Sequence, residues 1–302
     1  MSKKILITGG SGFIASHLAS ALKSEADVFL HIRPTSKSPP LILSGVTNIL
    51  SDSLNTEDIG KSLPSEIDTV FHLAGTTNPR DALGMANSNV VTTANVINLM
   101  ADRGIPNLIF ISTAAVWGGA LNSRIDESTP EAPDTHYGYA KLAAESLIVD
   151  AVTRGVISAA TILRCNGTYG FGSCQGVVAN FYNRLRNCEA VSIDGDGLQL
   201  REPLYVSDLV DLMLCSSTRI NGLQVYAVSG PQTLTVLDIA RTIAKVINRE
   251  LAIEWLPERN DRNRHIILSN SKAQEFLNWK PFIYLQDGLR MMISAELEQL
   301  TR

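Results

Sequence analysis

Short runs of apolar residues recur along the first half of the chain, and each is nearly continuous rather than alternating with polar positions. This pattern is typical of strands that are covered on both faces of a sheet. The runs predict six strands, at residues 4–8, 27–32, 47–50, 68–75, 107–113 and 158–164.

Segments with helical periodicity separate these runs and predict helices over residues 12–24, 89–104 and 140–155, the last two ending at Gly104 and Gly155 as C-caps. About six strand–helix units in alternation predict an α/β fold with a parallel, doubly wound sheet. The rhythm loosens after residue 170. We therefore expect one domain over residues 1–168, with later segments returning to it. Residues 169–302 are expected to form a smaller, mixed α/β region at the sheet's carboxyl edge, where such folds bind ligands.

Composition narrows the class of protein. The chain has 302 residues, of which 45% are hydrophobic and 19% charged, as in ordinary globular proteins. A net charge of −4 argues against a nucleic-acid partner, and no apolar run approaches a membrane span. Four cysteines without metal-ligand spacing indicate reduced thiols in a cytoplasmic protein and no metal site.

The stretch KILITGGSGFIASHL joins the first predicted strand to the first predicted helix through Gly9, Gly10 and Gly12. Residues without a Cβ permit a tight turn, and backbone N–H groups at the start of the helix can then face an anion. A glycine-rich turn is a weak signal by itself. The strand before it and the amphipathic helix after it favour a phosphate-binding turn here.

A second signal is THYGYAKLAAE, which places Tyr137 four residues before Lys141 on one face of a predicted helix. Such pairs are common on helices and mean little in isolation. An ammonium beside a phenol can however lower the phenol's pKa and make it an acid–base group near neutral pH. His136 and Tyr139 are interpreted as helix-start residues without a chemical role.

Taken together, these motifs resemble the extended short-chain dehydrogenase/reductases, the NAD(P)-dependent epimerase/dehydratase family. The turn is similar to the family's TGGxGFIG, with Ala15 in place of the third glycine. FISTAAVWGG resembles the family's SSxxVYG and puts its catalytic hydroxyl on Thr113. The resemblance implies a Rossmann-like sheet, with Thr113, Tyr137 and Lys141 as catalytic residues.

The resemblance also implies a bound nicotinamide dinucleotide in the first domain, with Asn89 as a structural asparagine. Its implied contacts are Gly9, Gly12, Phe13, Ile14, Arg33, Asp52, Ser53, Leu73, Ala74, Gly75, Tyr137 and Lys141. Family members that use NAD have an acid at the end of the second strand, where this chain has Arg33. Because an arginine can clamp a 2′-phosphate, NADP(H) is slightly favoured over NAD(H).

The second half implies a nucleoside-diphosphate sugar as substrate. IDGDGLQLREPLYVSDLVDLM resembles a family segment in which Arg201 grips the diphosphate. Asp208 is predicted to cap a helix beginning at Leu209. A second phosphate contact is assigned to Arg262 within a cluster that includes Arg259 and Arg264, and a sugar contact to Asn166. The family resemblance further implies a homodimer through the helices that hold Asn89 and Tyr137.

The two residues that follow the catalytic hydroxyl restrict the type of reaction. Sugar-nucleotide dehydratases of the family have Asp-Glu where this chain has Ala114 and Ala115, and decarboxylating members keep the glutamate. Alanine cannot move a proton, so both reactions are disfavoured. Reduction of a nucleoside-diphosphate-4-keto-6-deoxy sugar with NADPH is slightly favoured over NAD-dependent 4-epimerisation. A catalytically silent dinucleotide sensor, and a reductase of steroid or flavonoid-type alcohols, are the remaining alternatives.

Overall fold

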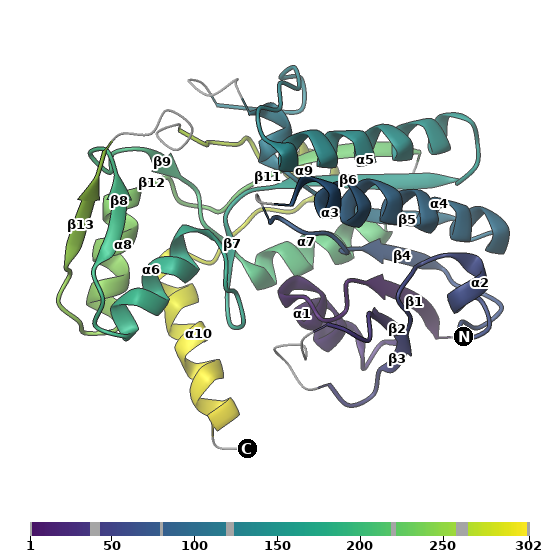
Figure 1. Ribbon diagram of the computed structural model, residues 1–302, viewed down its shortest axis with the longest axis horizontal. Coiled ribbons are helices and arrows are strands. Elements are labelled where there is room, and N and C mark those ends of the chain that lie inside the picture. Colours follow the sequence, from purple (N-terminus) through teal and green to yellow (C-terminus); the bar gives the residue numbers. More distant parts are fainter. Residues whose placement is uncertain are drawn as a thin grey trace. The chain divides into compact units, whose positions relative to one another are not determined.

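A seven-stranded sheet organises the first part of the chain (Figure 1). The computed structural model describes residues 2–36, 43–78, 81–118, 124–218, 222–257 and 265–300. The sheet's strands are β1 (Lys3–Thr8), β2 (Ala26–Ile32), β3 (Thr47–Leu50), β4 (Thr69–His72), β5 (Asn107–Thr113), β6 (Ala159–Cys165) and β11 (Leu223–Val228). Their order is β11-β6-β5-β4-β1-β2-β3, and β1 pairs in parallel with both β2 and β4.

The strand order changes direction at the neighbours β1 and β4, which is the switch point where sheets of this kind bind ligands at their carboxyl ends. The register pairs Thr8, the last residue of β1, with His72, the last residue of β4. The loops that follow these two strands therefore start at the same level. This register positions the candidate cofactor site described below.

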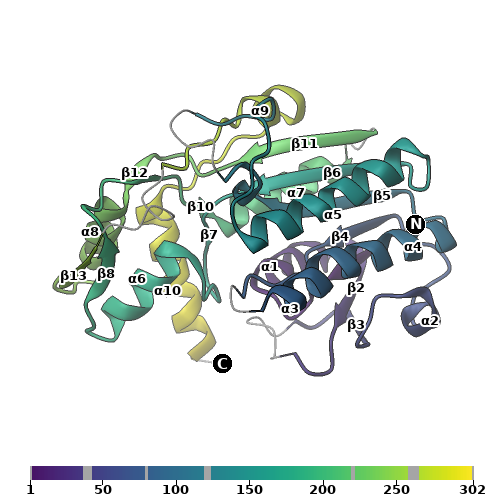
Figure 2. The same ribbon diagram turned by 45° about the horizontal axis from the view of Figure 1, so that its top comes forward.

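Helices cover both faces of the sheet. They are α1 (Phe13–Leu22), α2 (Thr56–Ile59), α3 (Ala82–Ala86), the π-helical turn η1 (Asn87–Val91), α4 (Thr92–Arg103), the 3-10 turn η2 (Ala114–Trp117), α5 (His136–Thr153) and α7 (Val206–Thr218). The helices α4 and α5 run side by side along one face, and α1 lies on the other (Figures 1 and 2). Apolar side chains of α2, α4 and α5 pack with those of the strands into one buried core.

Two compact units divide the chain. Unit 1, which contains the sheet, comprises Met1–Gly119, Glu131–Arg164 and Val210–Tyr226. Unit 2 comprises Ala120–Pro130, Cys165–Leu209 and Ala227–Arg302. Whether a boundary near residue 168 separates a cofactor domain from a substrate domain stays a prediction.

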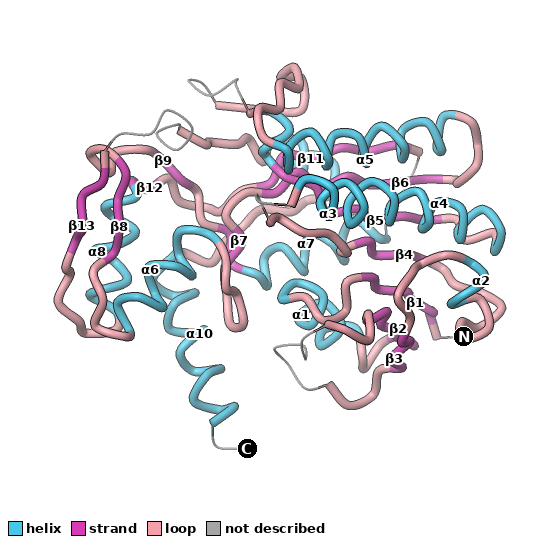
Figure 3. Tube along the Cα trace, in the orientation of Figure 1, coloured by secondary structure: helices cyan, strands magenta, loops and turns pink. Residues whose placement is uncertain are grey.

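Unit 2 combines strands of two to four residues with helices (Figure 3). Its strands are β7 (Thr168–Tyr169), β8 (Val191–Asp194), β9 (Leu200–Arg201), β10 (Leu204–Tyr205), β12 (Leu234–Thr235) and β13 (Ile253–Leu256), paired as β7–β10, β8–β13 and β9–β12. Its helices are α6 (Gly176–Arg186), α8 (Val236–Val246), α9 (Ser271–Leu277) and α10 (Leu285–Leu300). No helix in the described part of either unit is long and apolar enough to cross a membrane.

All six predicted strands are confirmed, although β4 ends at His72 rather than at residue 75. The sequence prediction missed β11 as a seventh strand of the sheet. Gly104 is the left-handed C-cap of α4 as predicted, whereas Arg154 caps α5 and Gly155 follows it with φ +70°.

The prediction for Asp208 was wrong. The helix α7 already begins at Val206, so Asp208 lies inside its first turn instead of capping it. The side chain accepts hydrogen bonds from the backbone N–H groups of Phe282 (3.1 Å) and Ile283 (3.0 Å), which fix the segment before α10.

Candidate functional site

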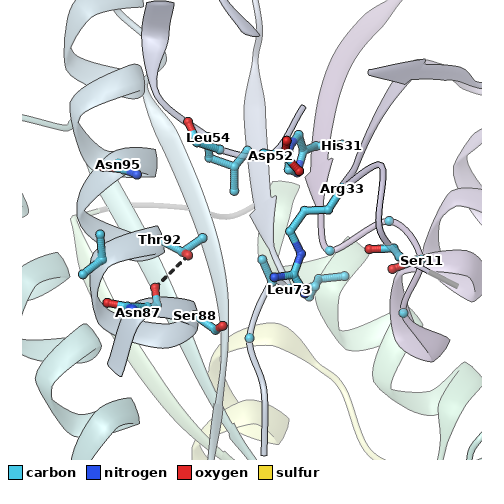
Figure 4. A pocket seen from close by; sticks show the side chains of 18 residues that line it. Ser11, His31, Arg33, Asp52, Leu54, Leu73, Asn87, Ser88, Thr92 and Asn95 are labelled. Carbon is cyan, nitrogen blue, oxygen red and sulfur yellow. Dashed lines mark hydrogen bonds between the residues drawn. The ribbon is translucent and has the colours of Figure 1, made fainter. Parts of the chain in front are cut away.

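A pocket of about 350 Å³ lies within unit 1, at the loops that follow β1 to β4 and beside η1 and α4. Figure 4 shows Arg33 extending into it between the loop that holds Ser11 and the loop that holds Leu73, with Asn87, Ser88 and Thr92 on the opposite wall. The lining combines a glycine turn, a cation and many polar groups. Such a lining suits a ligand that carries phosphates and hydroxyls.

The glycine residues of the turn allow neighbouring backbone segments, as well as a ligand, to approach closely. Gly9 has φ +71°, and a Cβ on it would lie 2.8 Å from the backbone nitrogen of Ala74. A Cβ on Gly10 would lie 2.9 Å from the backbone oxygen of His31, to which Gly10 N–H donates a 2.8 Å hydrogen bond. Gly12 is the N-cap of α1. The absent side chains therefore let the turn approach the loop after β4 and the end of β2, and leave a cradle that a Cβ would fill.

A buried chain of hydrogen bonds ties this turn to the next wall of the pocket. Thr8 Oγ1 accepts from the backbone N–H groups of Leu73 (3.1 Å) and Ala74 (3.2 Å) and lies 2.8 Å from His72 Nδ1. His72 Nε2 lies 3.0 Å from Thr93 Oγ1, which donates to the backbone oxygen of Asn89. Thr93 therefore accepts from His72 Nε2–H, and Thr8 donates to Nδ1, so the imidazole is neutral.

The pKa of His72 agrees with this assignment. Burial lowers it, and the charges of Lys141 and His31 lower it further, to about 3.

Asn89 is also buried, and its Nδ2 donates to the backbone oxygens of Thr76 (3.0 Å) and Met85 (2.9 Å). The asparagine thus links the loop after β4 to α3.

Most of the predicted cofactor contacts lie together in this pocket. Its lining includes Gly9, Gly12, Arg33, Asp52, Ser53, Leu73, Ala74 and Gly75. Phe13 and Ile14 form the first turn of α1 and are half-buried outside the lining. Ser53 donates its hydroxyl to Asp58 (2.6 Å), so this hydroxyl is already engaged within the fold.

Several lining residues were missed from the sequence. They are Ser11, His31, Ser36, Leu54, Asn87, Ser88, Val91, Thr92 and Asn95, whereas Gly10 belongs to the glycine turn that the sequence predicted. Four of them, Asn87, Ser88, Thr92 and Asn95, are polar residues on one helical segment. Their recurrence at helical spacing was the signal that could have identified this face.

The predicted catalytic residues come from β5 and α5. Thr113 ends β5, and its Oγ1 accepts a 3.2 Å hydrogen bond from the backbone N–H of Ala115. Tyr137 is half-buried in the first turn of α5, and Lys141 is buried one turn further on. The Lys141 ammonium lies 4.0 Å from the centre of the Phe110 ring, a cation–π contact that keeps it in the interior.

Gly138 makes the approach between these two elements possible. A Cβ on this residue would lie 2.4 Å from the backbone oxygen of Ala115. The start of α5, and with it Tyr137, therefore packs directly on the turn η2 that follows Thr113. The structure brings the hydroxyl and the phenol onto touching segments that are 24 residues apart in the chain.

Of the predicted substrate residues, Thr113 lies in unit 1 and the others belong to unit 2. Burial lowers the pKa of Arg201 to about 10, and its Nη1 donates to the backbone oxygen of Leu200 (2.8 Å). The Nδ2 group of Asn166 is buried and has no hydrogen-bond partner among the residues that the structure describes. The prediction for Arg262, with its alternatives Arg259 and Arg264, falls outside the described residues.

A doubly wound sheet, a glycine turn at its switch point and a Tyr–Lys helix define a nicotinamide-dependent enzyme of the short-chain dehydrogenase/reductase type. Residues 5–228 match the model of the NAD dependent epimerase/dehydratase family. The chain belongs to this family.

Similar proteins act on nucleotide sugars by name. UDP-glucuronic acid decarboxylase 3 of Arabidopsis thaliana is 30% identical over 305 residues, which cover 96% of this chain and 87% of that protein. The dTDP-D-glucose 4,6-dehydratase of Mus musculus is 26% identical over 97% of this chain and 88% of that protein.

Two solved structures match nearly the whole fold. The UDP-glucose 4-epimerase of Thermotoga maritima with UDP-glucose has a TM-score of 0.87 and 26% identity, over 98% of this chain and 99% of that one. The UDP-glucuronic acid 4-epimerase of Bacillus cereus, in complex with UDP-glucuronic acid and NAD, has a TM-score of 0.87 and 27% identity over the same shares.

Proposed function

We propose that this protein catalyses hydride transfer at C4 of a nucleoside-diphosphate sugar, with Tyr137 as its acid–base residue. The observation that carries the proposal is the packing of Gly138 on the backbone of Ala115, which places the start of α5 against the segment after Thr113. A hydroxyl, a phenol and a buried ammonium are the groups that oxidation of an alcohol requires.

A bound nicotinamide supplies the hydride acceptor or donor, and the residues of the chain handle the proton. Lys141 is a buried cation one helical turn from Tyr137, so it stabilises the phenolate and lets the phenol exchange a proton with the sugar oxygen. Thr113 uses its oxygen to accept from Ala115, so its own proton can be donated to the same sugar oxygen. The pocket in unit 1 would hold the phosphates and the adenosine.

Epimerisation at C4 is the form of this reaction that the comparisons favour, because two solved structures of high similarity are named as UDP-sugar 4-epimerases. Dehydration and decarboxylation are disfavoured although sequence relatives carry those names. The side chains at positions 114 and 115 are methyl groups on the turn after Thr113, and neither can take or give a proton.

NADPH-dependent reduction of a 4-keto-6-deoxy sugar is the second candidate, and Arg33 favours it. Arg33 extends into the pocket of unit 1, where its positive charge can attract the 2′-phosphate of NADP (Figure 4). A consumed reductant is in general NADPH, whereas an epimerase regenerates its NAD in each cycle. The choice of cofactor thus separates the two candidates.

The substrate side of the proposal rests on two residues of unit 2. Arg201 is a half-buried guanidinium suited to a diphosphate, and Asn166 offers a donor without a partner among the described residues to a sugar or a uracil. Arg262 is proposed as a second phosphate contact.

The test uses UDP-glucose that carries deuterium at C4, together with absorbance at 340 nm. An epimerase yields the C4 epimer with the deuterium retained and no net change in absorbance. A reductase leaves UDP-glucose unchanged and oxidises NADPH in step with an added UDP-4-keto-6-deoxyglucose. If neither reaction occurs, and NADH and NADPH do not bind, the proposal fails.

A further inference from the structure

A buried guanidinium connects all the segments that carry the proposed catalytic groups. Arg164, near the end of β6, donates from Nη2 to Glu145 Oε2 (2.7 Å) and from Nε to both carboxylate oxygens, Oε2 (3.1 Å) and Oε1 (3.3 Å). Its Nη2 also donates to Glu131 Oε1 (2.7 Å). The side chains of Arg164 and Glu145 are only 5% and 3% exposed, so water does not share in this bidentate ion pair.

Glu145 reaches the strand that bears the catalytic hydroxyl. It lies four residues after Lys141 on the buried face of α5, and its Oε1 accepts a short hydrogen bond from the hydroxyl of Ser112. Ser112 directly precedes Thr113 on β5. One carboxylate therefore ties the helix of Tyr137 and Lys141 to the strand of Thr113.

Arg164 also holds the turn after that strand. Its guanidinium carbon lies 4.7 Å from the centre of the Trp117 ring, and Trp117 is a fully buried residue of η2. Glu131 belongs to the segment that leads into α5. Burial acts to lower the pKa of Arg164, but hydrogen bonds and charge from Glu145 and Glu131 raise it above its ordinary value, so the cation is retained.

Stability is a weak reason for a fold to keep such a pair. The free-energy cost of removing two charges from water is about as large as the gain from their attraction. Apolar side chains of similar volume therefore often give the same stability. A bidentate fork differs from an apolar contact in fixing direction and distance. Hydride and proton transfer depend on fixed geometry, and a displacement of about 1 Å can cost roughly 10²-fold in rate.

We propose that the Arg164–Glu145 pair is a positioning device for the reaction. It sets the separation between Thr113 on β5 and the Tyr137–Lys141 face of α5, and it touches neither substrate nor cofactor. The proposal rests on the function proposed above.

The test combines steady-state kinetics with hydrogen exchange on the full chain, using UDP-glucose and UDP-glucuronic acid as probes. Arg164→Lys keeps the charge but loses the fork. We expect kcat to fall about 10²-fold, with the NADH dissociation constant unchanged within about twofold. Backbone exchange should rise at residues 112–118 and 136–142 but not at residues 9–12.

A second variant separates positioning from stability. The double variant Glu145→Met/Arg164→Met removes both charges, so its melting temperature should be closer to that of the wild type than the melting temperature of Arg164→Lys is. We expect kcat to stay low and backbone exchange at residues 112–118 and 136–142 to stay raised. The matched control is Arg154→Met, which breaks the exposed pair with Asp150 on the same helix and should leave kcat and exchange unchanged.

Wild-type kcat in either Arg164 variant would overturn the proposal, as would a loss of kcat without altered exchange at these segments. If the wild type converts neither probe and does not oxidise NADPH with UDP-4-keto-6-deoxyglucose, the proposed function fails. The exchange data then still decide whether the pair holds β5 and α5 together.

Discussion

The two units of this protein place their candidate residues on very different supports. In unit 1, Gly9 follows a strand of six residues and Thr113 ends a strand of seven residues, and both strands belong to one sheet. In unit 2, Arg201 lies on the two-residue strand β9, which pairs only with β12 among the described residues. In unit 1, a regular sheet positions the candidate residues. In unit 2, individual contacts between segments distant in the chain position them.

This difference matters because the two kinds of support respond differently to substitution. A residue at the end of a strand of the sheet is held by many backbone hydrogen bonds. A substitution there changes the chemistry of the side chain and leaves the sheet intact. A residue on a short element depends on a few partners, as the bonds of Asp208 to the segment before α10 illustrate. The following changes test that contrast.

Replacement of Tyr137 by Phe has the largest expected effect. The ring still packs in the first turn of α5, but the proton carrier is gone, so turnover should fall by about 10³-fold. NADH affinity should stay unchanged, which fluorescence titration measures. Turnover within tenfold of the wild type would remove Tyr137 from its role as the acid–base residue.

Replacement of Gly9 by Val should abolish cofactor binding in a folded protein. The new Cβ would lie within 2.9 Å of the backbone of Leu73 and Ala74, in the cradle between the loops. We expect NADH and NADPH affinity to fall by about 10²-fold or more. The control is Gly104→Val, at φ +64° with open space around it, which suffers the same backbone strain but should bind NADH normally.

Replacement of Arg201 by Leu tests unit 2. A buried cation that contacts phosphate oxygens contributes about 2 kcal/mol, so UDP affinity should weaken about 30-fold in calorimetry while NADH affinity holds. Unchanged UDP affinity would instead favour a substrate without a diphosphate, such as a steroid or flavonoid-type alcohol.

Acidification should destabilise unit 1 through His72. Its pKa is about 3 in the fold and 6.5 in the unfolded chain, so the unfolded state binds the proton first as the pH falls below 6.5. The contribution is complete above pH 6.5 and is lost progressively toward pH 3, by about 2 kcal/mol at pH 5.

Urea unfolding of the wild type and His72→Asn at pH 7 and pH 5 measures this loss. Burial also lowers the pKa of His31, so the loss of unfolding free energy that His31 causes between pH 7 and pH 5 is common to the wild type and the variant. An equal total loss of unfolding free energy in the two proteins would mean that His72 is not held neutral.

Replacement of Arg33 by Ala is expected to have the smallest effect. If the guanidinium clamps a 2′-phosphate, NADPH affinity should fall about tenfold while NADH affinity stays the same. An equal response for both dinucleotides would leave Arg33 as a solvated residue of the pocket wall and favour an NAD-dependent epimerase.

The framework of unit 1 could be predicted from the sequence because its signals are local. Buried parallel strands appear as continuous apolar runs, and the glycine turn and the Tyr–Lys spacing lie within single segments. The strand β11 was missed because its role depends on the chain returning to the sheet after the unit 2 segment Cys165–Leu209 and the helix α7.

Contacts between distant segments could not be predicted in the same way. Glu145, Arg164 and Ser112 lie on three different elements, and nothing in their local sequence indicates that they meet. The pairing of Asp208 with residues 282 and 283 is of the same kind. A carboxylate near a helix start predicts a cap from local rules, and the tertiary partner took precedence here.

Native mass spectrometry of the purified protein tests the central claim, that the pocket of unit 1 holds a nicotinamide dinucleotide. We predict that the wild type carries, or takes up at micromolar concentration, one NAD or NADP per chain, and that the Gly9→Val protein carries neither. A wild-type chain that binds no nicotinamide dinucleotide, or equal loading of the Gly9→Val protein, would contradict the account.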